Sequence, residues 1–575
     1  MNQKCAYGIA AVILLIALVR IISADRTRPQ GFDEPAHVAA GMEWLQFHTY
    51  HLDTLHPPIA RLAVALPLYF SGLRFQEGRS SSLPDFWDAG NSILYQGKYL
   101  RNLARARFGI LPFLVILVIV TFSWTRLQFG SFGALAAVVL VCTLPVVLSF
   151  ASLAYTDFPA ACMQVCCILA FAAWVERPGL RLSAVLGALF GLAVLTKFTS
   201  LLYVPVAAAS IVLCRFVLVK RSGGKAVPPP RFLMKNLALI ALITTVVVWG
   251  GYRFSVGGID QALGITKQAM PSFQHLPGPV RGLAREMIAS DWKIPAPEFF
   301  AGLANAWVMN KTSPNAYLFG RFKAGGWWYF FMVEALFKTP LPFLLLVLVG
   351  IRPLYRSFLE GNWKSLVPAT AAVSIALLTT TVGINFGLRH VLVIFLFLAI
   401  VAGYGAHELW HTPRGARVGK ALLIGLIGWQ CFSVLRPSTD WIAYFNELAG
   451  RDPSKILVTG CDLDCGQDVL NLSDELRRRN VSHVGLALWT TADLQNMGLP
   501  HFDVLEPFQP RTGWVAISAR AMREGSVQHN GYPPDAFAWL NQYKPITHVG
   551  STIWLYWIPS PDQPTARGAV ASTRG

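Results

Sequence analysis

Long apolar blocks recur along the chain, and each is about 20 residues long, which is the length of an α-helix that crosses a bilayer. Shorter polar stretches separate the blocks. This pattern predicts a polytopic α-helical membrane protein with about eleven transmembrane helices. The predicted spans are 6–23, 108–125, 132–151, 158–175, 182–199, 201–219, 236–252, 328–350, 366–384, 391–409 and 419–435.

Basic residues are concentrated in alternate loops between these spans, and lysine and arginine mark the cytoplasmic side of a membrane protein. The orientation that places all of these loops inside has the N-terminus inside and residues 24–107 and 253–327 as two large outer loops. The basic residues of the inside loops are Arg126, Arg177 and Arg181, the KRSGGK run with Arg231 and Lys235, Arg352, Arg356 and Lys364, and Arg414, Arg417 and Lys420.

One further segment, "PPIARLAVALPLYFSG" at 57–72, is apolar enough to suggest a twelfth span. It is short, it contains Arg61 and Pro67, and a span here would turn every later basic loop to the outside. We therefore predict a helix that lies in the membrane interface, within the first outer loop.

The pattern changes after the last span, where short strand-like runs replace the long apolar blocks. "KILVTG", "SHVGLAL", "WVAIS" and "STIWLYWI" are predicted strands, and "DVLNLSDELRRR" is a predicted helix. We expect a transmembrane domain over 1–435, a small α/β domain on the outer, periplasmic face over 436–559, and a disordered tail over 560–575.

Composition agrees with this scheme, because the 575 residues are 54% hydrophobic and only 14% charged. The formal net charge of +18 does not indicate a nucleic-acid partner, since much of it lies in the short inside loops and is suited to lipid phosphates. The first apolar block follows Lys4 without a small-residue cleavage site, so we expect it to be retained.

Seven of the nine cysteines lie in apolar segments, where they are best interpreted as small core residues. Cys461 and Cys465 lie in a polar region. They are able to form a disulfide if that region is periplasmic, and their spacing alone does not indicate zinc.

Several ionisable residues fall at the outer ends of the predicted spans or in the first outer loop. Charged groups at this depth are costly and are usually functional. The residues are Asp33, Glu34, His56, Asp157, Lys197 and Arg389.

Each of these residues alone has a structural explanation. The acids of "FDEP" and "TDFP" precede prolines and are able to cap helices. Lys197 is able to extend along apolar surface to the interface, and His56 before two prolines is able to start a helix. Arg389 is harder to explain, because an arginine on the outer face opposes the charge bias. Their coincidence on one side of the membrane favours a shared function.

The set suits the transfer of a sugar from a lipid phosphate. Lys197, Arg389 and His56 are able to stabilise the departing phosphate, and Asp33 is able to accept the proton of a hydroxyl or amine acceptor. Attack opposite the phosphate inverts the anomeric centre. Asp157 then positions the acceptor or, with an acid of the first loop such as Asp33, holds a divalent cation.

The motifs themselves resemble those of a known group. "FDEPAH", "LHPPIARL", "YTDFP", "GLAVLTKFTSLL", "AYLFGRFKAGGWWYFFMVEALFKTPLPFLLL" and "GLRHVLVIFLFLAI" are similar, in this order, to segments of the polyprenyl-phosphate-sugar-dependent glycosyltransferases of superfamily C. This group, GT-C, includes protein O-mannosyltransferases and bacterial lipid A aminoarabinose transferases. "DWIAYFNELAG" with "CDLDCGQDVL" resembles a junction in a bacterial subgroup that has a C-terminal periplasmic domain.

The resemblance implies a GT-C architecture in the bacterial inner membrane, with the active site on the periplasmic side. It implies Asp33 as catalytic base with Glu34 as its neighbour, and Asp157 as a second acid. His56, Lys197 and Arg389 become phosphate contacts. Ile59 replaces the leucine of the His-Pro-Pro-Leu motif, and Cys465 stands where the subgroup has tryptophan.

The predicted partners are a polyprenyl-phosphate sugar and an acceptor that is a lipid, a glycan or a protein. Two other hypotheses compete with an enzyme, namely a transporter or flippase of a lipid-linked sugar and a membrane anchor for the C-terminal domain. We find no internal repeat of the kind that transporters show. An anchor does not explain six polar groups on one face.

Overall fold

The computed structural model describes residues 2–75, 85–221, 230–258, 278, 281–282, 293–311, 316–412, 416–435, 440–528 and 530–560. The chain forms two compact units. The membrane unit comprises Met1–Arg26, Asp33–Ala316 and Lys323–Leu448, and the C-terminal unit comprises Thr27–Phe32, Tyr317–Phe322 and Ala449–Gly575.

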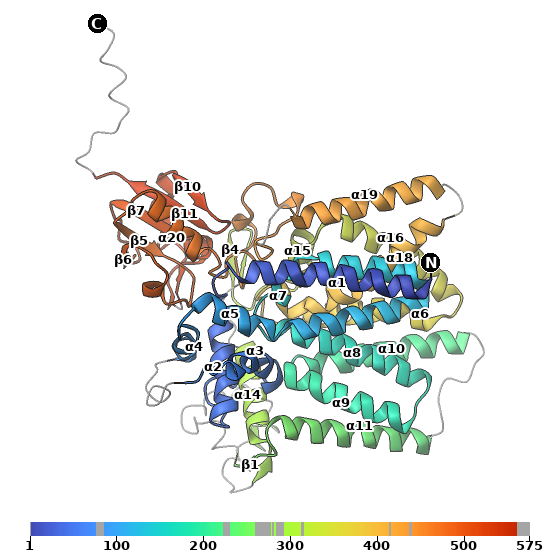
Figure 1. The fold of residues 1–575 in the computed structure, drawn as a ribbon. Coiled ribbons are helices and arrows are strands. Elements are labelled where there is room, and N and C mark those ends of the chain that lie inside the picture. Colours follow the sequence, from blue (N-terminus) through green and yellow to red (C-terminus); the bar gives the residue numbers. More distant parts are fainter. Residues whose placement is uncertain are drawn as a thin grey trace. The chain divides into compact units, whose positions relative to one another are not determined.

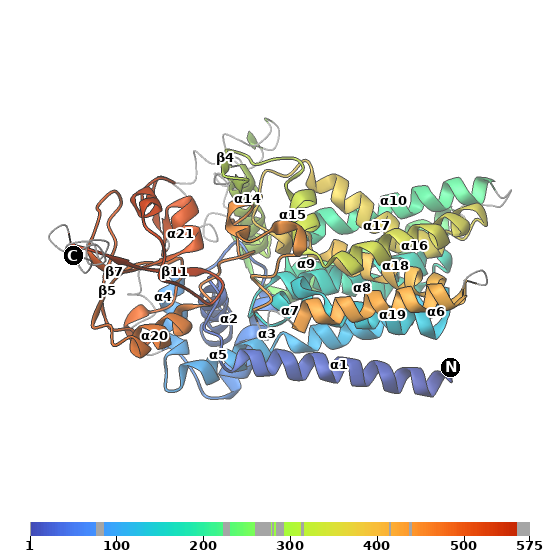
Figure 2. The ribbon, with the colours of Figure 1, turned by 90° about the horizontal axis from the view of Figure 1, so that it is seen from above.

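Long helices that pack side by side build the membrane unit (Figures 1 and 2). Within the described ranges, eight helices are long and apolar enough to cross a membrane. The prediction of a multi-pass helical membrane protein is thus confirmed, whereas the number eleven stays a prediction. In the described ranges, all α-helices of the membrane unit outside its two large outer loops, whether or not they are long enough to span, are α1 (Gln3–Asp25), α6 (Leu111–Thr143), α7 (Pro145–Ala151), α8 (Asp157–Glu176), α9 (Leu180–Thr196), α10 (Ser200–Arg221), α11 (Pro230–Gly251), α15 (Phe330–Lys338), α16 (Leu341–Leu359), α17 (Trp363–Thr379), α18 (Leu392–His411) and α19 (Ala416–Leu435).

The structure corrects the prediction of one continuous helix over 328–350. Helix α15 ends at Lys338, and α16 begins at Leu341. Thr339, between them, is extended, because the residue before a proline avoids helical backbone angles. The helical pattern is therefore interrupted at Pro340, although the apolar block is continuous in sequence.

The described part of the first outer loop, 24–75 and 85–107, contains four short helices, α2 (Glu34–Gln46), α3 (Pro58–Phe70), α4 (Phe86–Leu94) and α5 (Tyr99–Phe108). The predicted helix at 57–72 is present as α3, and its location in the membrane interface stays a prediction. Helices α2 and α3 cross so closely that a Cβ at Gly41 would lie 2.2 Å from the carbonyl oxygen of Arg61. This contact requires glycine at position 41 and brings the start of α2 close to the segment that precedes α3.

Much of the second outer loop, 253–327, lies outside the described residues. Its described elements are β1 (Val256–Gly257), β2 (Ile294–Pro295), α14 (Pro297–Lys311), β3 (Ala316–Leu318) and β4 (Arg321–Lys323).

A five-stranded sheet forms the centre of the C-terminal unit, in the order β10-β11-β7-β5-β6. Strand β5 is parallel to both β6 and β7, whereas β11 is antiparallel to β7 and β10. The α/β character predicted for this region is confirmed. The elements are α20 (Val469–Arg478), β5 (His483–Ala487), β6 (His501–Val504), β7 (Gly513–Ser518), α21 (Ala519–Glu524), β8 (Ser526–Val527), β9 (Asn530–Gly531), β10 (Thr547–Val549) and β11 (Ile553–Ile558).

Three of the four predicted strands are present, as β5, β7 and β11, and the predicted helix is α20. "KILVTG" is not a strand, so this prediction was wrong. Leu457 and Val458 of this run are buried, but the run makes hydrogen bonds with another segment of the same unit and pairs with no described strand. The Ile456 carbonyl accepts a hydrogen bond from the Phe319 N–H, and the Thr459 hydroxyl accepts one from the Tyr317 N–H. The predicted tail beyond residue 560 lies outside the described residues.

The segment Thr27–Phe32 belongs to the C-terminal unit although it is early in the sequence. The Phe32 ring stacks on Trp489, with centroids 4.0 Å apart and planes 4° apart. The Thr491 hydroxyl donates a 2.7 Å hydrogen bond to the Phe32 carbonyl. The Arg520 guanidinium lies 3.9 Å from the Trp489 ring centroid. Phe32 is thus fixed immediately before Asp33 in the chain.

Candidate active site

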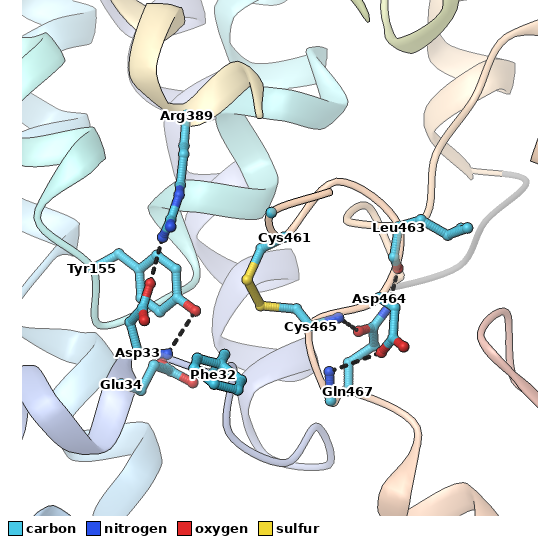
Figure 3. Close-up of a disulfide and its surroundings, with 12 residues drawn as sticks. Phe32, Asp33, Glu34, Tyr155, Arg389, Cys461, Leu463, Asp464, Cys465 and Gln467 are labelled. Atoms are coloured by element: carbon cyan, nitrogen blue, oxygen red, sulfur yellow. Dashed lines mark hydrogen bonds and ion pairs between the residues drawn. A yellow bond between two sulfur atoms is a disulfide. The ribbon is translucent and has the colours of Figure 1, made fainter. Parts of the chain in front are cut away.

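Asp33 occupies the residue before α2, but its side chain does not cap that helix. Its Oδ2 atom lies 2.5 Å from Nη1 of Arg389, and its backbone N–H donates a 2.9 Å hydrogen bond to the Tyr155 hydroxyl oxygen (Figure 3). The Asp33 carboxylate is 27% exposed, so solvent and ligands are able to reach it. Asp33 therefore does not cap α2, and its carboxylate is paired with Arg389 instead.

Arg389 comes from a short 3₁₀ helix, Leu388–Val391, directly before α18. Gly387 precedes this helix with φ of 93°, a left-handed conformation that favours glycine. The Arg389 guanidinium lies 5.6 Å from the Tyr155 ring centroid. Its Nε is buried and has no hydrogen-bond partner among the described residues, so a donor at this position is available to a ligand.

Asp157 and Lys197 form a second ion pair, between the first turn of α8 and the residue that follows α9. Both side chains are largely buried, so the lysine does not extend to solvent. Arg389 also interacts electrostatically with Asp157. The Tyr203 hydroxyl donates a 3.1 Å hydrogen bond to the His390 carbonyl, which ties α10 to the segment that carries Arg389.

His56 lies two residues before α3 and faces a third carboxylate. Its Nδ1 is 2.9 Å from Oδ2 of Asp53. The His37 ring, in α2, meets His56 edge-on with centroids 5.0 Å apart, and it meets Tyr155 in the same way at 5.8 Å. Arg61 donates a short hydrogen bond to the Asp53 carbonyl. These contacts connect Asp53, His56, His37 and Tyr155, in that order.

The charges of these groups act on one another. Burial raises the pKa of Asp33, but the Arg389 guanidinium and His37 outweigh burial, so the pKa lies below its ordinary value. Burial, together with His56, lowers the pKa of His37 to about 4, although Asp53, Asp33 and Asp157 oppose this change. His37 is therefore neutral near pH 7.

Glu34 has a different environment from Asp33, although the two are adjacent. Its carboxylate is fully buried and accepts hydrogen bonds from Nε and Nη2 of Arg107, at 2.8 and 2.7 Å. It also accepts a 2.7 Å bond from the Ala154 N–H. These contacts join α2 to α5 and to the residues that precede Asp157. Glu34 therefore stabilises the packing of the segments that carry Asp33 and Asp157.

The structure thus brings five of the six predicted residues into one electrostatically connected cluster, namely Asp33, His56, Asp157, Lys197 and Arg389. Glu34 is directed into the buried pair with Arg107.

Sequence reasoning did not select four residues that complete the arrangement: His37, Asp53, Arg107 and Tyr155. His37 and Tyr155 lie within the motifs "FDEPAH" and "YTDFP", and Asp53 lies three residues before His56. Their proximity to selected residues was the available signal. Arg107 offered none, since it is one of three arginines in "LRNLARARF".

The part of the chain that the structure describes contains two clusters of side chains that are able to hold a metal ion. His37, Asp53 and His56 form one cluster, and the exposed His483, His501 and Asp503 form another. The predicted metal acids, Asp33 and Asp157, are in neither cluster and are each paired with a basic side chain.

In the C-terminal unit, Cys461 and Cys465 form a disulfide (Figure 3). The loop between them is further held by Gln467, whose amide donates to the Leu463 carbonyl at 2.8 Å and accepts from the Cys465 N–H at 2.7 Å. Asp464 is buried in this loop, and burial raises its pKa to about 6 despite the bond it accepts from the Arg520 N–H.

No family model and no curated protein matches the sequence. Among solved structures, the chain is similar to the Saccharomyces cerevisiae protein O-mannosyltransferase Pmt1–Pmt2 complex bound to the sugar donor, with a TM-score of 0.51 and 10% identity over 76% of this chain and 90% of that chain. The chain thus shares the fold of this complex.

Other solved structures are similar at lower TM-scores, among them an ArnT and an oligosaccharyltransferase. ArnT from Cupriavidus metallidurans bound to undecaprenyl phosphate has a TM-score of 0.46 and 12% identity over 95% of this chain and 98% of that chain. The Archaeoglobus fulgidus oligosaccharyltransferase in the apo form has a TM-score of 0.47 and 13% identity over 90% and 70%. The expected GT-C architecture thus rests on the yeast complex.

Proposed function

We propose that this protein is an inverting glycosyltransferase, which moves a sugar from a polyprenyl-phosphate donor to an acceptor. The observation that carries the proposal is the pair of Asp33 and Arg389, next to the pair of Asp157 and Lys197. A reaction that separates a phosphate from a sugar needs both a proton acceptor and fixed cations. The fold shared with a yeast O-mannosyltransferase complex supports this reaction class.

In the proposed reaction, an acceptor hydroxyl or amine attacks the anomeric carbon from the face opposite the phosphate. The bond between that carbon and the phosphate oxygen breaks, and its electron pair leaves with the polyprenyl phosphate. The acceptor proton passes to the Asp33 carboxylate. The configuration inverts because the attack and the departure occur on opposite faces.

The basic side chains have the complementary role. Lys197 and Arg389 bind the phosphate oxygens as negative charge develops on them, and His56 contributes a third polar contact. The unpartnered Nε of Arg389 is suited to this contact, since Nη1 already faces Asp33. Phosphate binding also weakens the hold of Arg389 on Asp33, which makes that carboxylate a better proton acceptor.

Asp157 positions Lys197 and, as the second acid, orients the acceptor. We infer a positioning role for Glu34, because its carboxylate is occupied by Arg107 and the Ala154 N–H. The reaction takes place at the periplasmic face of a bacterial inner membrane, where the C-terminal unit also lies. The acceptor is a lipid, a glycan or a protein.

The decisive experiment measures sugar transfer from a polyprenyl-phosphate sugar by the purified protein in liposomes. Asp33→Asn should abolish transfer and leave donor binding and the folded state unchanged. Asp503→Asn, on an exposed strand of the C-terminal unit, is the matched control and should transfer normally. Normal turnover by Asp33→Asn would exclude the mechanism, and lipid flipping without sugar transfer would identify a transporter.

A further inference from the structure

Three side chains of a kind that binds metals lie close together near Asp33. The proposed reaction uses one of them, His56, but does not use the three together. His37, Asp53 and His56 each offer one ligand atom, and these atoms lie within 4.8 Å of one another. They come from α2 and from the segment before α3, which the close packing at Gly41 brings together.

The distances between the ligand atoms are close to those that an ion requires. Asp53 Oδ2 lies 2.9 Å from His56 Nδ1 and 3.9 Å from His37 Nδ1. Bonds of about 2.0–2.2 Å to a central ion place neighbouring ligand atoms about 3–3.6 Å apart. The imidazole of His37 therefore needs only a small movement for all three atoms to reach one ion.

The Nδ1 atom of His37 gives an independent indication of a ligand. The His37 side chain is 3% exposed, and Nδ1 is buried with no hydrogen-bond partner among the described residues. A buried polar atom without a partner costs about 1–3 kcal/mol. This atom faces Asp53 Oδ2 at a distance too long for a hydrogen bond, so it is a buried nitrogen without a partner at the edge of the cluster.

We propose that His37, Asp53 and His56 bind a divalent transition-metal ion. Two imidazole nitrogens and one carboxylate favour zinc, manganese or iron over magnesium and calcium, which prefer oxygen ligands throughout. Three protein ligands leave further coordination positions open. His56 is 27% exposed, so the cluster is accessible from solvent on that side.

Arg61 also faces Asp53 and has to be included in the charge balance. Its Nη1 lies 3.7 Å from Oδ2, but its hydrogen bond is to the Asp53 main-chain carbonyl. The guanidinium thus forms an ion pair with the carboxylate but does not donate a hydrogen bond to it. The carboxylates of Asp33 and Asp157 also interact with His37, but each is itself paired with a basic side chain, so Asp53 is the carboxylate of the cluster.

On the basis of the proposed glycosyltransferase reaction, the open positions suit an oxygen of the donor phosphate. Metal binding itself does not depend on that reaction, so the two proposals are tested apart. The exposed cluster of His483, His501 and Asp503 is a second possible site, although Arg511 Nη1 already lies 2.6 Å from Asp503. Metal binding at the first cluster is therefore measured in a variant that lacks both His483 and His501.

The experiment uses the full-length protein in detergent, stripped with a chelator and titrated with Co²⁺ while visible absorption is followed. His483→Ala with His501→Ala should still bind one ion per chain. In that background, Asp53→Asn or His37→Phe should weaken binding by more than about 100-fold, because even second-shell changes cost 10- to 100-fold. His48→Ala, in the nearby loop, is the matched control and should bind normally.

Gel filtration and thermal melting establish that each variant is folded. His37→Phe keeps an aromatic ring and provides a second test if Asp53→Asn is unstable. The proposal is overturned if Co²⁺ does not bind, or if binding disappears only with His483 and His501. Failure of Co²⁺ to bind leaves the transferase reaction standing, and Co²⁺ binding without sugar transfer leaves the metal site standing.

Discussion

The Asp33 carboxylate contacts the Arg389 guanidinium although 356 positions separate the two residues. The arginine lowers the pKa of an acid that burial alone would raise. Asp33 is therefore ionised, as a proton acceptor must be, over the whole physiological range. The predictions that follow test this pair, the neighbouring ion pairs and the buried acid of the C-terminal unit.

Arg389→Gln should move the acid limb of kcat/KM to higher pH. Activity falls as pH decreases through the Asp33 pKa, because the protonated acid accepts no proton. Loss of the nearby cation leaves burial as the largest influence and raises that pKa. The measurement is kcat/KM for sugar transfer between pH 4 and 8. Arg356→Gln, in an exposed pair with Glu408, should leave the limb unchanged; an unmoved limb in Arg389→Gln would disprove the coupling.

Lys197→Met should raise KM for the donor by about 10- to 150-fold, since hydrogen bonds to charged groups contribute about 1.5–3 kcal/mol. Lys197→Arg keeps the charge and should recover part of the affinity. Donor binding measured with polyprenyl phosphate should follow the same order. Lys364→Met is the control. Like Lys197, Lys364 is paired with an acid, Glu176, but it lies at the surface, so this change should leave KM for the donor unaltered. Equal donor affinity in all three variants would remove Lys197 from the phosphate site.

Glu34→Ala should destabilise the protein by about 3–5 kcal/mol, because it leaves Arg107 buried without its bidentate partner. Glu34→Gln keeps an acceptor for the Ala154 N–H and should retain more stability. Thermal unfolding in detergent, with activity per folded molecule, separates stability from chemistry. Full stability combined with lost turnover in Glu34→Gln would instead assign this residue to catalysis.

Asp464→Asn should change how the C-terminal unit responds to pH. The folded-state pKa of Asp464, about 6, lies above the ordinary value, so its contribution to stability is complete below about pH 4 and is lost as pH rises through 6. The wild type should therefore lose up to about 3 kcal/mol over this range relative to the variant. Hydrogen exchange of the β7 amides in the full-length protein measures the difference.

Asp503→Asn, a change at an exposed carboxylate, is the control for the Asp464→Asn experiment. Its stability should vary with pH in the same way as that of the wild type. If Asp464→Asn and the wild type kept parallel stabilities from pH 4 to 7, burial would not control the ionisation of Asp464.

Local signals predicted the helices well, because the length of an apolar block is a property of neighbouring residues. They failed at Pro340, where one residue outweighs an apolar pattern, and at "KILVTG", whose backbone partners lie more than a hundred residues earlier. Asp33 and Glu34 are equivalent in sequence. The structure separates them, because successive residues at a helix start point in different directions and only one faces Arg107.

The stacking of Phe32 on Trp489 has a practical consequence for anyone who shortens the protein. A truncation before Ala449 would remove the aromatic partner of the residue that adjoins the proposed catalytic base. Loss of activity in such a fragment would therefore not by itself show that the C-terminal unit takes part in the reaction. Versions intended for functional comparison should retain Trp489 and Thr491 together with the segment Thr27–Phe32.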